Sequence, residues 1–134
     1  RLNDVKEKNI IFDGFPRNVE QAIAFDKMLT VDKVIYLNLS EELAQDRLLN
    51  RLTCINCGYV TKKTDRKDNI CPKCGGQLKT RSDDTIDSIK KRFEVYKKET
   101  NPLIKIYRSR GVLYEIDASR TPREITLDVL KVIE

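Results

Sequence analysis

The sequence predicts an α/β protein, a parallel sheet with flanking helices, that carries a small cysteine-rich insert. Short apolar runs of strand length alternate with longer segments whose apolar residues recur every three or four positions, which is typical of parallel sheets covered by helices. Residues 53–80 interrupt that order with four cysteines and few large apolar side chains. A chain of 134 residues is long enough for one modest core and such an insert.

Before the insert, strand and helix patterns alternate twice. Asn9–Asp13 predicts a buried strand that ends in a carboxylate, and Asn18 predicts a helix N-cap with Gln21 at capping-box spacing. The apolar stripe of that helix consists of Ala22, Phe25, Met28 and Leu29. Lys33–Asn38 predicts a second buried strand, and Ser40 predicts the cap of a second helix. The apolar side of the second helix consists of Leu43, Ala44, Leu48 and Leu52.

After the insert, the helical pattern resumes and one further strand follows. The apolar positions of the first helix here are Ile86, Ile89, Phe93 and Tyr96. The Asn-Pro pair at 101–102 predicts a break, after which another helix runs to Gly111 as its C-cap. Val112–Ile116 predicts the third strand, and Thr121 predicts a capping box with Glu124 for the last helix.

The insert contains two Cys-x₂-Cys pairs, each followed by glycine. The four cysteines are Cys54, Cys57, Cys71 and Cys74. Two such turns supply four thiolates to one tetrahedral ion, which indicates structural Zn²⁺ with no ligand position left for chemistry. Two disulfides, free thiols or an iron–sulfur cluster are the alternatives. Zinc would fold an insert too small for its own core. We expect the zinc-binding insert to span residues 51–82, between two parts of the main domain, residues 1–50 and 83–134.

Basic residues are concentrated around the insert. Residues 46–81 contain nine Lys and Arg and three acids, whereas the whole chain has a net charge of +5, so the remainder is close to neutral. This predicts an anionic partner, nucleic acid or a nucleotide polyphosphate, unless the segment is only a solvated basic surface. The chain has no histidine, which excludes histidine acid–base catalysis. We find no apolar run of membrane-spanning length and no signal peptide, and therefore expect a cytoplasmic protein.

A turn and several arginines fit phosphate binding. Asp13-Gly14-Phe15-Pro16-Arg17 follows the first predicted strand, at the sheet end where α/β proteins bind ligands, although an Asp-Gly pair is also ordinary turn chemistry. The arginines that recur near the insert are Arg47, Arg51, Arg81 and Arg92. Guanidinium groups bind phosphate oxygens in pairs, and phosphoryl transfer needs mainly alignment and charge neutralisation, although each arginine alone is typical of a surface. Asp83 and Asp84 predict either a helix cap or contacts that close the insert against these arginines.

These motifs, in this order, resemble adenylate kinase in its bacterial long-lid, zinc-bearing form. The matching segments are Asp-Gly-Phe-Pro-Arg with Gln21, Asp46-Arg47 with Arg51, the four cysteines with Gly75 and Gly76, Arg81-Ser82-Asp83-Asp84 with Arg92, Tyr96 with Asn101-Pro102-Leu103-Ile104, and Ile116-Asp117. They span nearly the whole chain. The resemblance implies a P-loop nucleoside monophosphate kinase-like fold with its N-terminal part missing. It also implies reversible phosphoryl transfer from ATP to AMP, giving two ADP, by the full-length protein.

The resemblance further implies roles for individual residues. The AMP side would be formed by Gly14, Arg17, Gln21, Arg81 and Arg92. The ATP side would be formed by Arg47, Arg51, Val60, Thr61 and the backbone near Arg120. The catalytic residues would be Asp13, which orients Mg²⁺ through water, together with Arg17, Arg51, Arg81 and Arg92. The implied cofactors are structural Zn²⁺ on the four cysteines and Mg²⁺ bound with the nucleotide, and the insert would close over ATP as a lid.

One family motif is absent from the sequence. No Gly-Lys followed by Ser or Thr occurs, so the Gly-rich loop that cradles phosphates in the family is missing. The strand that leads into this loop is missing with it. By the resemblance, that strand would lie in the sheet between the strands predicted at 9–13 and 33–38. We therefore expect this chain to be the C-terminal portion of an adenylate kinase and to be inactive by itself. The full-length protein is expected to be a monomer, and another chain could complete the sheet of this portion. No membrane or nucleic-acid partner is expected on this reading. The alternatives are a zinc-ribbon module that binds nucleic acid through its basic segment, and a non-catalytic remnant that binds AMP.

Overall fold

Two separate sheets organise residues 9–134, the part of the chain that the computed structural model describes. In the first, β1 (Val34–Asn38) and β5 (Leu113–Asp117) run parallel, with the first residues of the two strands opposite each other. The second sheet is antiparallel, in the order β3-β2-β4. Its strands are β2 (Arg51–Cys54), β3 (Val60–Lys62) and β4 (Leu78–Lys79). The strands predicted at 33–38 and 112–116 are confirmed to within one residue.

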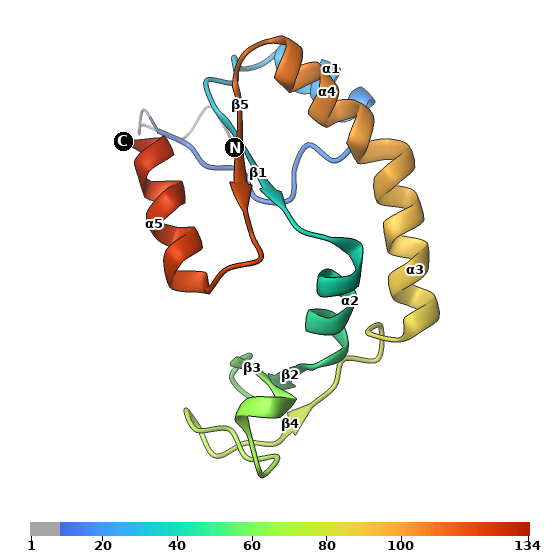
Figure 1. The fold of residues 1–134 in the computed structure, drawn as a ribbon, viewed down its shortest axis with the longest axis vertical. Helices are drawn as coiled ribbons and strands as arrows, with labels where there is room; N and C mark the ends of the chain where they lie inside the picture. Colours follow the sequence, from blue (N-terminus) through green and yellow to red (C-terminus); the bar gives the residue numbers. More distant parts are fainter. Residues whose placement is uncertain (1–8) are drawn as a thin grey trace.

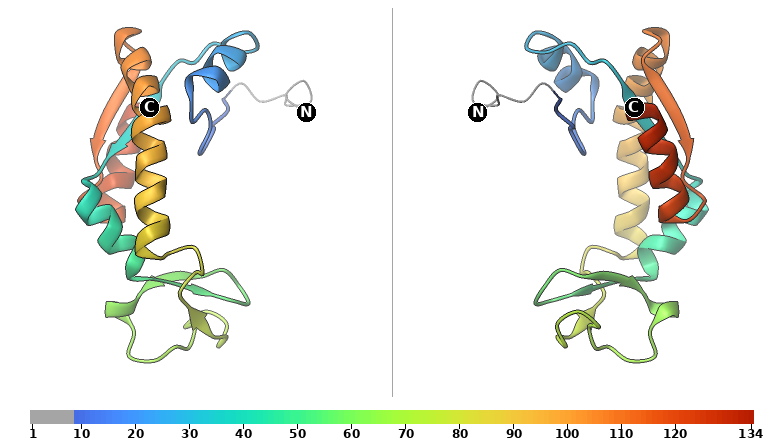
Figure 2. Two further views of the ribbon diagram at one scale, coloured as in Figure 1. Left: turned by 90° about the vertical axis from the view of Figure 1, so that its right-hand side faces the viewer. Right: turned by 90° about the vertical axis from the view of Figure 1, so that its left-hand side faces the viewer.

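In this part of the chain, five α-helices cover the parallel pair or lead to the second sheet (Figure 1). They are α1 (Val19–Asp26), α2 (Glu41–Leu49), α3 (Ile86–Val95), α4 (Asn101–Ser109) and α5 (Pro122–Ile133). A 3₁₀ turn, η2 (Lys63–Asp65), follows β3, and a π turn, η3 (Tyr96–Thr100), joins α3 to α4. The helix α5 lies on one side of the β1–β5 pair, and α3 and α4 lie on the other (Figures 1 and 2). Among the described helices, none combines the length and the apolar character needed to cross a membrane.

The helices begin at the predicted caps. The hydroxyl of Ser40 accepts a backbone N–H at the start of α2, and Thr121 forms the predicted capping box of α5. Asn18 caps α1 as predicted, because its Oδ1 accepts the N–H of Gln21 at 2.8 Å. The capping box expected at Asn18 is wrong. The Gln21 Oε1 accepts the N–H of Arg17 at 2.8 Å, so this side chain holds the preceding turn instead of the cap residue.

The helical break predicted at 101–102 is also wrong. The elements α3, η3 and α4 follow one another without a gap and form one continuous helical run that bends between α3 and α4 (Figure 1), which we call the α3–η3–α4 rod. Pro102 lies in the first turn of α4, where a missing N–H is tolerated, and the π turn just before it changes the hydrogen-bonding pattern. At the other end, α4 stops at Ser109 with Arg110 as its C-cap, one residue before the predicted Gly111. Gly111 follows the cap with φ +74°, the left-handed backbone that commonly ends a helix.

Two apolar cores hold these elements. Between α1 and α4, Ala22, Leu103 and Tyr107 are buried. The partly buried residues packed against them are Val31, Val34, Val112 and Leu113. The second core lies inside the insert and consists of Leu52, Cys54, Cys71 and Leu78. Leu52 was expected on the apolar side of α2, but α2 ends at Leu49 and Leu52 belongs to β2. The insert therefore has its own small core, half of which is cysteine.

The strand predicted at Asn9–Asp13 is not formed. Within the described residues, β1 pairs with β5 alone, and the segment before the turn has no strand beside it. An isolated strand leaves its backbone N–H and C=O groups without partners. Residues 9–13 therefore do not form a strand, although their apolar pattern is typical of one. Ile11 is accordingly 80% exposed. Phe12 and Phe15 pack instead against Phe25 of α1, with ring centroids 4.8 and 5.5 Å away.

Candidate nucleotide site and metal centre

The turn that precedes α1 is tied together by its own polar groups. Gly14 has φ +71°, and a Cβ there would lie 3.0 Å from Nη2 of Arg17. The Arg17 Nε donates to the Gly14 carbonyl at 2.8 Å, while the Arg17 N–H donates to Gln21. The hydroxyl of Thr100 donates to the Arg17 carbonyl at 2.8 Å, which fixes the turn to η3. The structure thus brings together Gly14, Arg17 and Gln21, and Asp13 lies exposed beside them.

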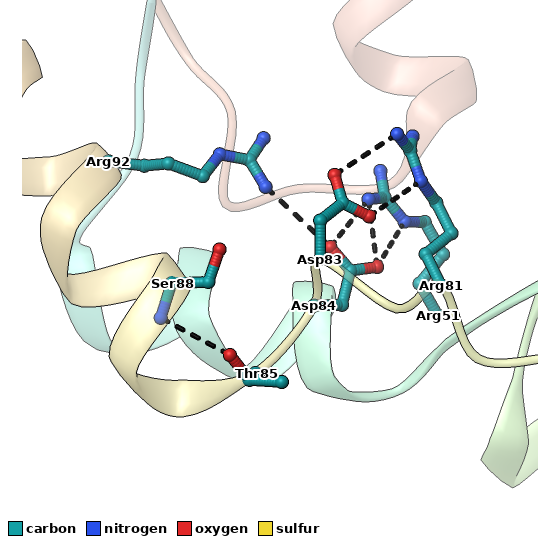
Figure 3. Close-up of polar contacts among 7 residues, drawn as sticks. All are labelled: Arg51, Arg81, Asp83, Asp84, Thr85, Ser88 and Arg92. Carbon is teal, nitrogen blue, oxygen red and sulfur yellow. Dashed lines mark hydrogen bonds and ion pairs between the residues drawn. The ribbon is translucent and has the colours of Figure 1, made fainter.

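A second group of predicted residues meets where the insert rejoins the core (Figure 3). Asp84, whose side chain is fully buried, accepts from Arg51 in bidentate fashion, with N–O distances of 2.8 to 3.1 Å. Nη1 of Arg92 lies 3.6 Å from Oδ1 of the same carboxylate, an oxygen that also accepts from Nη2 of Arg51. Next to them, Arg81 pairs with Asp83 at 3.1 and 3.2 Å, and both of those side chains are half exposed. Three arginines from three separate segments therefore converge on two carboxylates.

This arrangement decides between the two roles expected for the paired acids. The N-cap of α3 is Thr85, whose hydroxyl accepts the N–H of Ser88 at 3.3 Å (Figure 3). Asp83 and Asp84 contact arginines instead, so the capping interpretation is wrong and the contact with the arginines is confirmed. The sequence pattern gave no sign that Asp84 rather than Asp83 would be buried, because both precede the helix equally.

On α2, Arg47 holds the loop that follows β5. Its Nη1 donates to the Ala118 carbonyl at 2.6 Å, and its Nη2 donates to the carbonyls of Ser119 and Arg120 at 2.9 and 3.3 Å. Hydrogen bonds from the Ser119 hydroxyl and N–H hold the pKa of Asp117 below its ordinary value. Both β1 and β5 point their carboxyl ends toward this region (Figure 1), the sheet edge where α/β proteins bind ligands.

The predicted residues do not all meet in one place. Arg47 and Arg120, both expected on the ATP side, are in contact. Val60 and Thr61, also expected there, lie on β3 in the insert, Val60 exposed and Thr61 half-buried (Figure 1). The Arg17 turn contacts η3, whereas Arg92 belongs to α3. The turn at Gly14–Arg17 therefore lies beside η3, whereas the arginine cluster, Arg51, Arg81 and Arg92, lies farther along the α3–η3–α4 rod, toward the start of α3. Thr100, which links Arg17 to that rod, was not predicted, and nothing in its sequence context distinguishes it.

The four cysteines form one cluster in the insert. Their Sγ atoms all lie within 4.8 Å of one another. The Cys54–Cys74 and Cys57–Cys71 sulfur distances are 3.5 and 3.7 Å, and tetrahedral Zn–S bonds of about 2.3 Å place sulfurs about 3.8 Å apart. Backbone N–H groups of Asn56, Lys73 and Gly76 lie 3.4 Å from three of the sulfurs. The donor set, its spacing and its hydrogen bonds fit a four-thiolate zinc site.

The pKa values of two of these thiols also indicate that the cluster requires a nearby positive charge. The N–H of Cys57 lowers the pKa of Cys54 to about 6, against the opposing effect of burial. At Cys74 the N–H of Gly76 lowers the pKa, but the neighbouring sulfurs and burial together raise it to about 12. Thiolate charges this close repel one another unless a positive charge lies among them. A metal ion bound by the four cysteines would supply that charge.

Comparison with known proteins agrees with this geometry. The adenylate kinase family model matches residues 1–112. The chain is 38% identical to the adenylate kinases of Archaeoglobus fulgidus, Rickettsia africae and Caldanaerobacter subterraneus, over 96%, 99% and 95% of its own length. It covers 63%, 65% and 61% of those proteins, and so spans less than two thirds of the curated relatives that it matches. With most of its residues inside the family match, the chain belongs to the adenylate kinase family.

Proposed function

We propose that this chain forms three parts of an enzyme that transfers a phosphoryl group reversibly between ATP and AMP. These parts are the lid, the arginine cluster and the turn at Gly14–Arg17, which would bind AMP. The observation that supports it best is the convergence of Arg51, Arg81 and Arg92 on Asp83 and Asp84. Phosphoryl transfer is accelerated mainly by positioned positive charge that matches the charge of the transferred group. A cluster of arginines without histidine suits that reaction.

The two nucleotides would occupy different parts of the molecule. Gly14, Arg17 and Gln21 would bind AMP, whose phosphate would also contact Arg81 and Arg92. Arg47, Arg51, Val60, Thr61 and the backbone of Arg120 would contact ATP. Asp13 would orient Mg²⁺ through water, and the ion would neutralise the ATP phosphates. Closure of the insert, residues 51–82, would exclude water and so prevent hydrolysis of ATP.

Zinc in this scheme is structural. Cys54, Cys57, Cys71 and Cys74 would hold it and leave no open position for a substrate. The ion would stabilise the insert by joining the β2 end to the loop before β4, a region whose apolar core is small.

We further propose that these 134 residues do not turn over substrate alone, because their sequence has no Gly-rich phosphate loop. The test compares the zinc-loaded chain with a chimera in which the N-terminal part of the Archaeoglobus fulgidus relative precedes residue 9. ADP formation from ATP and AMP with Mg²⁺ is measured in both. We expect activity in the chimera alone.

Two variants of the chimera sharpen this test. Arg92→Ala should lower kcat on the order of 100-fold, the scale of losing one group that stabilises transition-state charge. Arg108→Ala, at an exposed ion pair with Glu115, should leave kcat unchanged. ADP formation by the chain alone would contradict the need for the loop. A folded chimera that binds AMP without turnover would favour a non-catalytic AMP-binding protein, and salt-dependent binding of RNA or DNA without nucleotide preference would favour a nucleic-acid-binding module.

A further inference from the structure

Asp84 is the buried charged residue of the arginine cluster. Its side chain has no exposed surface, whereas those of Arg51 and Arg92 are 24% and 52% exposed. A carboxylate removed from water must be compensated by nearby positive charge and hydrogen bonds. Arg51 supplies both, through three N–H···O contacts, and Arg92 supplies further positive charge from α3.

The carboxylate also allows the two guanidinium groups to lie close together. Without it, Arg51 and Arg92 would repel each other, and both long side chains would sample many rotamers. Asp84 engages the Nε and Nη2 edge of Arg51. Within the described residues, Nη1 of Arg51 has no acceptor, and Arg92 remains half exposed. Together with Asp84, the two arginines thus keep a net positive charge, and Nη1 of Arg51 is left free for another acceptor.

We propose that Asp84 is a positioning residue that fixes the orientation of Arg51 and attracts Arg92 to its side, so that the two guanidinium groups together bind one phosphate group. This rests on the proposed function, in which these arginines contact nucleotide phosphates. Arginines held in advance lose less rotamer entropy when the anion binds. Asp84 therefore increases phosphate affinity although its own charge is negative.

Asp83 provides a matched control. It has the same charge, is adjacent in sequence and also pairs with an arginine, but Asp83 and Arg81 are 50% and 51% exposed. An exposed pair of this kind holds its partner weakly. Replacing either aspartate by asparagine removes one negative charge from the cluster, so Coulomb attraction alone predicts that both variants bind an anion more tightly.

The experiment titrates inorganic tripolyphosphate into the zinc-loaded chain and follows the heat of binding. We expect Asp84→Asn to bind roughly tenfold more weakly, because the rotamer-rich Arg51 side chain must then be ordered on binding. Asp83→Asn should bind equally well or more tightly. Equal or tighter binding by a folded Asp84→Asn variant would overturn the proposal. Zinc content and circular dichroism establish that each variant is folded.

A second measurement on the unmodified chain does not depend on the variants. Hydrogen exchange at the Arg51 Nε–H, followed by NMR, should be much slower than exchange at the Arg81 Nε–H, because Asp84 holds the first in a buried contact. Equal exchange rates would overturn the positioning role. If the unmodified chain does not bind tripolyphosphate, the phosphate role of the cluster fails together with the proposed function. Slow exchange at Arg51 would then show only that Asp84 orders this arginine.

Discussion

The Arg47 guanidinium on α2 donates to the Ala118 carbonyl just after β5, at a distance of 2.6 Å. It also donates to the two following carbonyls, so one side chain fixes a whole loop at the carboxyl edge of the parallel pair. Arginine suits this task because its planar fork presents several N–H groups at once. A lysine has the same charge but only one nitrogen.

Arg47→Lys should therefore destabilise the chain even though the charge is retained. We expect the free energy of unfolding to fall by about 2 kcal/mol, the scale of hydrogen bonds made by a charged group, as measured by urea denaturation. Arg108→Lys, at an exposed pair with Glu115, is the control and should change it by less than about 1 kcal/mol. Equal effects of the two substitutions would show that the loop does not depend on the guanidinium fork.

Removal of the metal should unfold the insert selectively. Cys71→Ser removes a buried ligand that also belongs to the insert core. The variant should purify without zinc and lose the hydrogen-exchange protection of β2 and β4, because the remaining core is too small to hold them. The β1–β5 pair should retain its protection. Thr64→Ala, in the exposed η2 turn, should keep one equivalent of zinc. Full protection of β2 in a zinc-free variant would show that the insert folds without metal.

Two adjacent glycines should differ in their effect on metal affinity. A Cβ at Gly76 would lie 2.6 Å from Nδ2 of Asn56 and 3.1 Å from Sγ of Cys54, whereas a Cβ at Gly75 meets nothing within 4 Å. Gly76→Ala should therefore weaken zinc binding by displacing these groups. Gly75→Ala should lower stability by about 1 kcal/mol, because the position has φ +74° and a side chain there is strained, with little change in zinc affinity. Competition with a chelator measures the affinity, and the reverse order would contradict this account.

The ion pair between Arg110 and Asp26 should make stability depend on acidity. Hydrogen bonds from Arg110, with N–O distances of 2.8 and 3.0 Å, hold the pKa of Asp26 below its ordinary value of 3.8. A carboxyl whose pKa is lowered by folding stabilises the folded state above its unfolded pKa, and this contribution is lost as the pH falls toward the folded value. The chain should thus be more stable than Asp26→Asn near neutral pH, and the difference should shrink below pH 3.8. A difference that stays constant would exclude this linkage.

The sequence predicted those elements whose signals are local. Ser40 and Thr121 cap their helices as expected, because a cap depends on residues within one turn. The strand at Asn9–Asp13 failed for the opposite reason. Its apolar pattern shows that the segment is suited to burial in a sheet. Strand formation also requires a neighbouring strand to pair with, and none is present beside it among the described residues. The burial of Asp84 was likewise beyond the sequence, since it depends on Arg51 and Arg92 meeting from distant segments.

The α3–η3–α4 rod also determines the angle around its axis between the arginine cluster and the Arg17 turn. Arg92 lies on its first helix, and Thr100, which holds the Arg17 turn, lies in its π turn. Each residue of an α-helix advances the chain by about 1.5 Å and rotates it by about 100°. Deleting one residue of α3 between Arg92 and η3, with α-helical bonding kept, would swing the Arg17 turn about a quarter of a revolution around the rod relative to Arg92. The number of residues between these two positions is therefore as much a part of the site as the side chains themselves.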